Sequence, residues 1–402
     1  MQSLNLRLLE RSSFYTGFSF FFLDFYIQIL GVALNASAFD IGVFTAAVFA
    51  AQIVSHPIAG VLADRVGRSK TLALGGFVRV ASLVLVGVAF ALASPTIITI
   101  GRAIQGLAAG FFWTSSSAIV ADETEGGGRS GEFGRINLWV NRGMLVGAMG
   151  GLLLLPIRLD IPPYFFAAAA AVSGLYALRI RPTEPVRPVP AGNGLARPPL
   201  PKSSQITVGL AAINFLNSAG FLPIAAFLTV YVTKTVFPSG MAVNTYAVLI
   251  ALANAPQVLF LAFVAPRLAG LGDRMGRMKP LALALLANLP VSLGLIWIRE
   301  LWHLAVLGLL LAIVGIVFSA SFNSIVGDVY RSRRGFAYGG LNLSFSLGAA
   351  LGSTLGGLLF PLGWTTLVMV SVLIQATALA GVVLVWRGYS SSDVRFMESH
   401  SS

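Results

Sequence analysis

The sequence contains no cysteine and only three histidines, His56, His303 and His400. Disulfides and thiolate chemistry are therefore excluded, and the histidines are too scattered to suggest a metal site. Charge is also scarce, because Asp, Glu, Lys and Arg make up only 10% of the chain, against about 25% in soluble proteins. No nucleotide-binding loop or nucleophile with an adjacent base is recognisable. These absences argue against a metal site, a bound cofactor and an enzyme.

Long apolar runs dominate the rest of the chain. Hydrophobic residues make up 56% of it and the mean hydropathy is +0.83, which is typical of a protein surrounded by lipid. A helix crosses the hydrocarbon layer in about 20 residues, and the backbone in lipid must satisfy its own hydrogen bonds. We therefore expect an all-α integral membrane protein with twelve membrane-spanning helices, over 14–34, 40–63, 71–93, 95–121, 132–156, 163–180, 205–233, 243–265, 280–298, 301–327, 336–360 and 363–387.

The net charge of +12 invites the hypothesis of nucleic-acid binding, but the positions of the basic residues indicate another role. Only Arg158, Lys234 and Arg299 lie in the loops on one side of the predicted membrane, whereas the even-numbered loops and the tails carry nearly all the others. Cytoplasmic loops are enriched in Lys and Arg. We therefore expect a multi-pass protein of the cell inner (plasma) membrane with both termini in the cytoplasm, facing anionic lipid rather than nucleic acid.

The longest loop predicts a division of the chain. Residues 179–204 are rich in proline, glycine and arginine and are typical of a linker. We expect an N-terminal six-helix bundle over 1–180, a cytoplasmic linker over 181–204 and a C-terminal six-helix bundle over 205–402.

The two predicted bundles repeat each other. LADRVGRSK at 62–70 recurs as LGDRMGRMK at 271–279, in each case between the second and third helix of its half. INLWVNRGMLVGAMGGLLL at 136–154 recurs in LNLSFSLGAALGSTLGGLLF at 341–360, where the Gly-x-x-x-Gly spacing is typical of close helix packing. Two elements repeated in the same order indicate a duplicated six-helix unit with pseudo-symmetry.

These motifs resemble those of a known family. The string GVLADRVGRSK is similar to the signature loop of the major facilitator superfamily, and GRAIQGLAAG at 101–110 resembles its second motif. The resemblance covers the whole chain, and the pattern is closest to the drug/proton antiporters. One departure weakens that subgroup: Gly147–Ala148 stands where those antiporters carry Gly-Pro. The resemblance implies two halves that rock about a central substrate site.

The resemblance also implies that the repeated loop is a conformational latch. Glycine allows the tight turn, the Asp64 carboxylate would bond a helix N-terminus of the other half, and Arg68 would pair with Asp122 at the end of the fourth helix. In the second half, Arg277 would pair with Asp328. The predicted latch residues are Asp64, Gly67, Arg68, Asp122, Asp273, Gly276, Arg277 and Asp328.

Asp24 lies in the middle of the first predicted span, where a charge costs about 3 kcal/mol. Burial raises the affinity of a carboxylate for a proton, so Asp24 is a candidate for proton coupling and for substrate binding, with Gln28 one turn away. It is similar to the membrane-embedded acid of many drug/proton antiporters. The alternative is that a buried arginine neutralises Asp24 and that it never titrates.

Three arginines also lie within predicted spans. Arg102 occupies the second-motif position that the family implicates in proton coupling, with Gln105 one turn below. Arg142 lies near mid-depth beside Trp139, and its repeat counterpart is Leu347, so either pairing with Asp24 or binding an anionic substrate would explain it. Arg79 is expected to extend toward the cytoplasmic surface.

The remaining amides within spans complete the predicted substrate site: Asn141, Asn217, Asn254 and Gln257. Our first hypothesis is proton-coupled efflux of small apolar or cationic compounds by a monomer without a cofactor. The second is transport of an organic anion bound by the intramembrane arginines. A sensor or structural protein that no longer transports is a third hypothesis, which the motifs in both halves disfavour.

Overall fold

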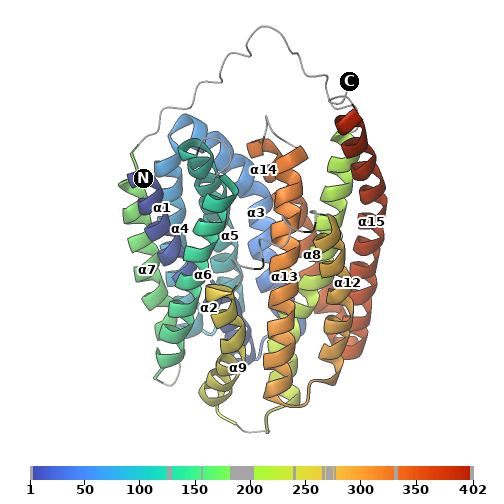
Figure 1. Ribbon diagram of the computed structural model, residues 1–402. Helices are drawn as coiled ribbons and strands as arrows, with labels where there is room; N and C mark the ends of the chain where they lie inside the picture. The colour runs from blue at the N-terminus through green and yellow to red at the C-terminus, as the bar shows by residue number, and fades with distance from the viewer. Residues whose placement is uncertain are drawn as a thin grey trace.

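The computed structural model describes residues 3–124, 129–154, 157–181, 203–238, 241–264, 278–329 and 334–398, together with residues 268 and 275. These residues form a bundle of helices, and no strand occurs among them (Figure 1). The N-terminal half, as we call the described residues up to Arg181, contains α1 (Leu4–Phe18), α2 (Phe21–Ala33), α3 (Ala38–Arg65), α4 (Arg68–Ala91), α5 (Pro95–Glu123), α6 (Arg129–Leu154) and α7 (Ile161–Leu178).

The C-terminal half contains the remaining helices, and the labels follow Figure 1. They are α8 (Ser203–Thr235), α9 (Val243–Phe263), α12 (Met278–Gly294), η2 (Leu295–Trp297), α13 (Leu301–Val329), α14 (Arg334–Leu359), η3 (Phe360–Leu362) and α15 (Trp364–Glu398). Each of the twelve predicted spans has a helical counterpart.

Nine helices of the described chain are long and apolar enough to cross a membrane, namely α3, α4, α7, α8, α9, α12 with η2, α13, α14 and α15. The helices α5 and α6 have 29 and 26 residues, which is ample length, but α5 carries Arg102 two turns from its start and α6 carries Arg142 in its middle. The polarity that lowers their hydropathy is thus concentrated in two helices of the N-terminal half.

The first span differs from the prediction. It begins at Leu4 rather than at residue 14, capped by Ser3, whose side chain accepts a hydrogen bond from the Leu6 amide. It is also broken after Phe18, because the Ser19 amide and hydroxyl both donate to the Thr16 carbonyl and the Phe20 amide donates to that of Gly17. Serine competes in this way for helical carbonyls. Hydropathy could not predict the start of α1 at Leu4, because the leucines there alternate with polar and charged residues and form no continuous apolar run.

Figure 1 places the beginning of α1 and the end of α15 at the same, upper end of the bundle. We call this the termini end and the opposite one the far end. Because the helices alternate in direction, α3 runs toward the termini end and α14 runs away from it.

The repeated Gly-x-x-x-Gly stretches make the same contact in both halves. Gly143 and Gly147 of α6 lie against the backbone carbonyls of Phe14 and Phe18 in α1. In the C-terminal half, Gly348 and Gly352 of α14 lie against the backbone of Phe215 and Ala219 in α8. The predicted packing role of these glycines is confirmed, and α6 packs on α1 as α14 packs on α8.

The buried apolar residues form three clusters, and their distribution is uneven along the bundle. At the far end one cluster spans both halves and joins residues such as Tyr26 and Phe44 to Phe227 and Trp364. At the termini end each half has its own cluster: one centres on α1, α4 and α5, the other on α8, α12 and α13. Among the described residues, the halves therefore share a core at the far end only.

Candidate functional site

Contacts between the halves are most extensive along α3 with α14, and next along α6 with α9. Smaller contacts join α2 with α8 and α9, α3 with α8, and α5 with α14. Between α3 and α14, Gly42 approaches Ser353 and Gly357 so closely that a β-carbon on Gly42 would lie 2.8 Å from the Ser353 carbonyl oxygen. Toward the termini end, by contrast, β-carbons on Gly60 of α3 and Gly340 of α14 would meet no atom of the described residues within 4 Å. The α3–α14 seam is therefore closely packed at Gly42, near the far end, whereas the described residues leave open space beside Gly60 and Gly340, nearer the termini end.

Two of the hydrogen bonds between described residues cross from one half to the other. The Ser346 hydroxyl donates to the Gln52 side-chain oxygen over 3.1 Å, with the Phe49 and Phe345 rings edge to face beside them. Nearer the far end, the Gln28 amide nitrogen donates to the Ala225 carbonyl over 3.0 Å. Gln28, a predicted substrate residue, thus lies at the inter-half contact; its role in binding cargo stays a prediction.

Arg102 and Gln105 form one buried unit in α5. Arg102 is 2% exposed; its Nη1 donates to Gln105 Oε1 over 2.7 Å, and its Nε donates to the Phe44 carbonyl of α3 over 3.2 Å. The structure brings together the two residues that the sequence placed on one face, and it joins them to α3 at the far-end core.

Arg79 is not extended toward the surface, so that prediction was wrong. The side chain is 2% exposed and its guanidinium lies 4.2 Å from the centre of the Phe20 ring, at the break between α1 and α2. The Phe20 ring in turn contacts Trp113 of α5 edge to face. Stacking on an aromatic face stabilises a cation that water does not reach, which the sequence position alone did not predict.

Asp24 lies in the first turn of α2, and its side chain is outside the described residues. The side chain of Asp328 is likewise outside the described residues. Asp273, Gly276 and Arg277 lie entirely outside them. The predicted roles of these five residues remain predictions.

Arg142 and Trp139 lie together on α6, as the spacing predicted. The Arg142 guanidinium is 5.2 Å from the Trp139 ring centre, and Phe14 of α1 contacts the same indole edge to face. Arg142 is only half-buried and forms no ion pair with any acid of the described chain. The Arg142 guanidinium therefore lies on the face of the Trp139 ring, and its positive charge is not neutralised by a described acid.

Four predicted substrate amides share another property. Asn141 on α6, Asn217 on α8 and Asn254 and Gln257 on α9 are all half-buried. Among the described residues, Asn254 makes one side-chain hydrogen bond, from Nδ2 to the Ile250 carbonyl over 2.8 Å, and the other three make none. An amide in hydrocarbon without a partner is costly. These side chains are thus expected to face water or a ligand.

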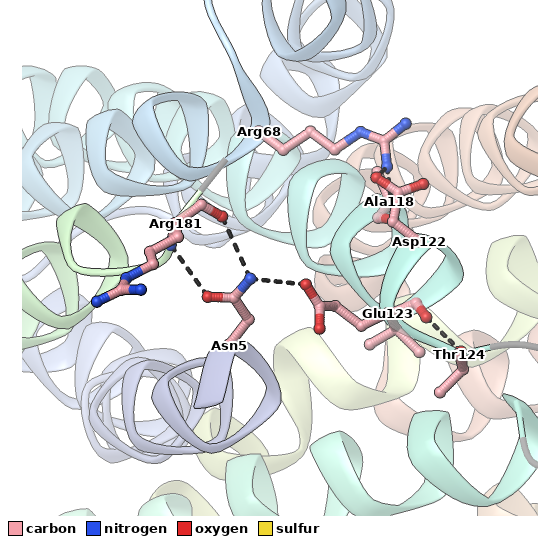
Figure 2. Close-up of polar contacts among 8 residues, drawn as sticks. Asn5, Arg68, Ala118, Asp122, Glu123, Thr124 and Arg181 are labelled. Atoms are coloured by element: carbon pink, nitrogen blue, oxygen red, sulfur yellow. Dashed lines mark hydrogen bonds and ion pairs between the residues drawn. The ribbon is translucent and has the colours of Figure 1, made fainter. Parts of the chain in front are cut away.

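The first copy of the repeated loop is ordered around one ion pair (Figure 2). Arg68 pairs with Asp122 at the end of α5, and its Nη1 also donates to the Ala118 carbonyl over 3.0 Å. Gly67 has a φ of 108°, a conformation that favours glycine. Asp64 is exposed. The structure brings together the pair that the sequence named, while its action as a latch stays a prediction.

A second set of polar contacts at the termini end was not predicted from the sequence. Asn5 of α1 donates to the Glu123 carboxylate over 2.6 Å and forms two bonds with the Arg181 backbone, as Figure 2 shows. Glu10 of α1 pairs with Arg135 of α6 over 2.7 Å. These partners are too far apart in sequence for spacing to reveal them. All these bonds lie within the N-terminal half.

No group of three or more His, Asp or Glu side chains that could hold a metal ion occurs in the part of the chain that the structure describes. The polar groups above are amides, hydroxyls, arginines and isolated carboxylates. Such groups bind substrates and protons through hydrogen bonds and charge.

The sequence model of the Major Facilitator Superfamily matches residues 12–326 and 260–395. The chain is 26% identical over 351 residues to the multidrug resistance protein MdtG of Escherichia coli O9:H4 strain HS, covering 83% of both chains. It is 22% identical to the quinolone resistance protein NorA of Staphylococcus aureus strain COL, covering 90% of both.

Solved structures share the fold. The human organic anion transporter MFSD10 (TETRAN) has a TM-score of 0.71 at 18% identity, and the match covers 95% of this chain and 100% of that one. The nucleoside transporter NupG has a TM-score of 0.65 at 17% identity, and the match covers 95% of this chain and 98% of that one. At these identities the likeness concerns the twelve-helix fold alone.

Proposed function

Because the chain belongs to the major facilitator superfamily, we propose that it is a secondary active transporter that exports small apolar or cationic compounds in exchange for protons, by alternating access. The observation that carries this proposal is the uneven core: one cluster shared by both halves at the far end and a separate cluster in each half at the termini end. Two bodies in contact at one end can rock about a point between the two ends, so that this contact opens as the opposite end closes and a central site is exposed to either side in turn.

The assignment of direction follows from the charge pattern. If both termini face the cytoplasm, the termini end is the cytoplasmic one, and this conformation opens inward. An exporter loads its cargo in that state. The Arg68–Asp122 pair would then keep α4 and α5 together during the transition, and a bond of Asp64 to the other half would form when the termini end closes.

Asp24 is the proposed coupling acid. A carboxyl in the first turn of α2 would take up a proton from outside and release it inside, while the cargo moves outward. The proton gradient supplies about 2.3 kcal/mol per charge per 100 mV plus the pH term. Arg102 is the second residue proposed to take part in proton coupling. The multidrug and quinolone resistance relatives support the export of drug-like compounds.

A second candidate is the transport of an organic anion. The observation that favours it is Arg142, half-buried on α6 and stacked on Trp139 without an ion pair in the described chain. Such a guanidinium can bind a carboxylate or sulfonate through charge-assisted hydrogen bonds.

The two candidates separate in a dye-accumulation assay with efflux-deficient bacteria. Cells that express the wild type, Asp24→Asn or Arg142→Leu are loaded with ethidium or Hoechst dye, with and without a protonophore. The proposal expects the wild type to lower accumulation, the protonophore to abolish the effect, and Asp24→Asn to match the empty vector. If inserted, folded wild type leaves every dye unchanged, cationic export is wrong and labelled organic anions are tested with Arg142→Leu.

A further inference from the structure

We propose that Asn254 and Gln257 form a hydrogen-bonding subsite for an N–H donor of the cargo, at the contact of α9 with α13, and that Gly308 keeps this subsite open. The inference rests on the proposed function and specifies which chemical group of the cargo the C-terminal half recognises.

The geometry of the subsite centres on Gly308. A β-carbon built on Gly308 would lie 3.2 Å from Gln257 Oε1 and 3.9 Å from Asn254 Oδ1. The two oxygens therefore converge near one point, although they come from residues one turn apart on α9. The absence of a side chain on Gly308 leaves these oxygens undisturbed.

The orientation of Asn254 is set by its other hydrogen bond. Its Nδ2 donates to the Ile250 carbonyl over 2.8 Å, and a carbonyl can only accept, so the opposite atom of the amide is the oxygen. That oxygen accepts no hydrogen bond from any described residue, and neither does Gln257 Oε1. Both side chains are half-buried, so their free acceptors remain accessible.

Two converging acceptors select a donor. An N–H group satisfies them, and a positively charged nitrogen satisfies them best, because charge-assisted hydrogen bonds are stronger than neutral ones.

Two glycines of α13 provide a matched test. Gly308→Ala puts a methyl group into tight contact with Gln257 Oε1, whereas Gly315→Ala adds the same methyl where no atom of the described residues lies within 4 Å. Gln257→Leu removes the acceptor at similar size. The probes are ethidium, which carries amino N–H donors, and tetraphenylphosphonium, which is a cation without any N–H group.

The experiment measures the Kd of each probe for the purified protein in detergent by titration calorimetry. We expect Gly308→Ala and Gln257→Leu to raise the Kd of ethidium about tenfold, which corresponds to about 1.4 kcal/mol, and to leave that of tetraphenylphosphonium within about twofold. Gly315→Ala is expected to bind both as the wild type does. Thermal unfolding of each variant shows whether it is folded.

The outcomes are distinct. If the wild type binds both cations but the variants weaken neither, or weaken both equally, the subsite is wrong while the proposed function stands. If the folded wild type binds neither cation and exports neither, the proposed function fails together with the subsite. If Gly308→Ala does not fold, the Kd values of Gln257→Leu alone decide whether the subsite exists. Gln257 is only half-buried and its side chain is flexible, so this substitution is expected to leave the fold intact.

Discussion

Gln52 and Ser346 share a hydrogen bond of 3.1 Å that joins the two halves at the middle of α3 and α14. Both residues are buried, at 7% and 0% exposure. Toward the far end from this pair, Gly42 of α3 lies against the α14 backbone, and toward the termini end the described residues leave open space beside Gly60. A bond at the middle of two rocking helices moves least, so we regard this pair as the pivot of the seam.

The pivot predicts a coupled effect on stability. Ser346→Ala leaves the Gln52 oxygen without its donor, and Gln52→Leu leaves the serine hydroxyl without its acceptor. Each is expected to lower the free energy of unfolding by about 1 kcal/mol. The double variant should cost less than the sum of the two, as measured by unfolding in detergent with a double-mutant cycle. Strict additivity would show that the bond contributes nothing.

The close approach of α3 to α14 at Gly42 is expected to matter for stability and transport. Gly42→Val forces α3 away from the Ser353 carbonyl and the Gly357 backbone, which cannot move aside as a flexible side chain does. We expect a loss of about 2 kcal/mol or more from overpacking, together with weaker transport. Gly60→Val, on the same helix and without described neighbours within 4 Å, is the control and should unfold at the wild-type temperature. Equal melting temperatures for both variants would contradict the closed seam.

The Arg68–Asp122 pair is testable by exchange of charge. The two side chains are 28% and 14% exposed, so water screens the pair only in part. Arg68→Ala is expected to reduce stability by about 1 kcal/mol, and Lys70→Ala, an exposed residue in the same turn, by much less. Arg68→Asp combined with Asp122→Arg should recover part of the loss relative to Arg68→Asp alone. If the exchange recovers nothing, the ion pair is not what matters at this position.

The hydrogen bond between Asn5 and Glu123 is expected to contribute to stability, although their spacing in the sequence does not indicate a contact. Asn5→Asp places a carboxylate against the Glu123 carboxylate and loses the amide donor, so it should destabilise the protein more than Asn5→Ala does. Adding Glu123→Gln should restore the donor–acceptor pair and part of the melting temperature. A melting temperature for Asn5→Asp equal to that of Asn5→Ala would mean that the two side chains do not interact.

Hydropathy predicted the helices well, because lipid imposes a length and an apolar composition on each span. The predicted and observed ends agree within a few residues for most helices, for example 95–121 against Pro95–Glu123. Two helices differ more. In the first span, Ser19 interrupts the helical bonding, and the leucines at the start of α1 alternate with polar residues, so that no continuous apolar run marks this start. The last helix, α15, continues to Glu398, beyond the predicted end at 387.

Side-chain partners were predictable only where a repeat or a fixed spacing constrained them. Arg102 with Gln105 and Arg142 with Trp139 are neighbours on one helix face, and the glycine repeats packed as expected. The bond of Gln28 to Ala225 and the stacking of Arg79 on the Phe20 ring depend on which helices meet. One sequence does not contain that information in any local pattern.

The most direct test of the central claim uses the absence of cysteine. Gln28→Cys with Ala225→Cys places the only two thiols of the chain across the far-end contact, where the native amide and carbonyl are 3.0 Å apart. A short bifunctional reagent that forms disulfides with both thiols then bridges the halves, and transport of a dye that the wild type exports is followed in proteoliposomes with an imposed proton gradient. Alternating access predicts that the bridge stops transport and that a reductant restores it. Undiminished transport by fully cross-linked protein would contradict the account, because the far end would then never need to open.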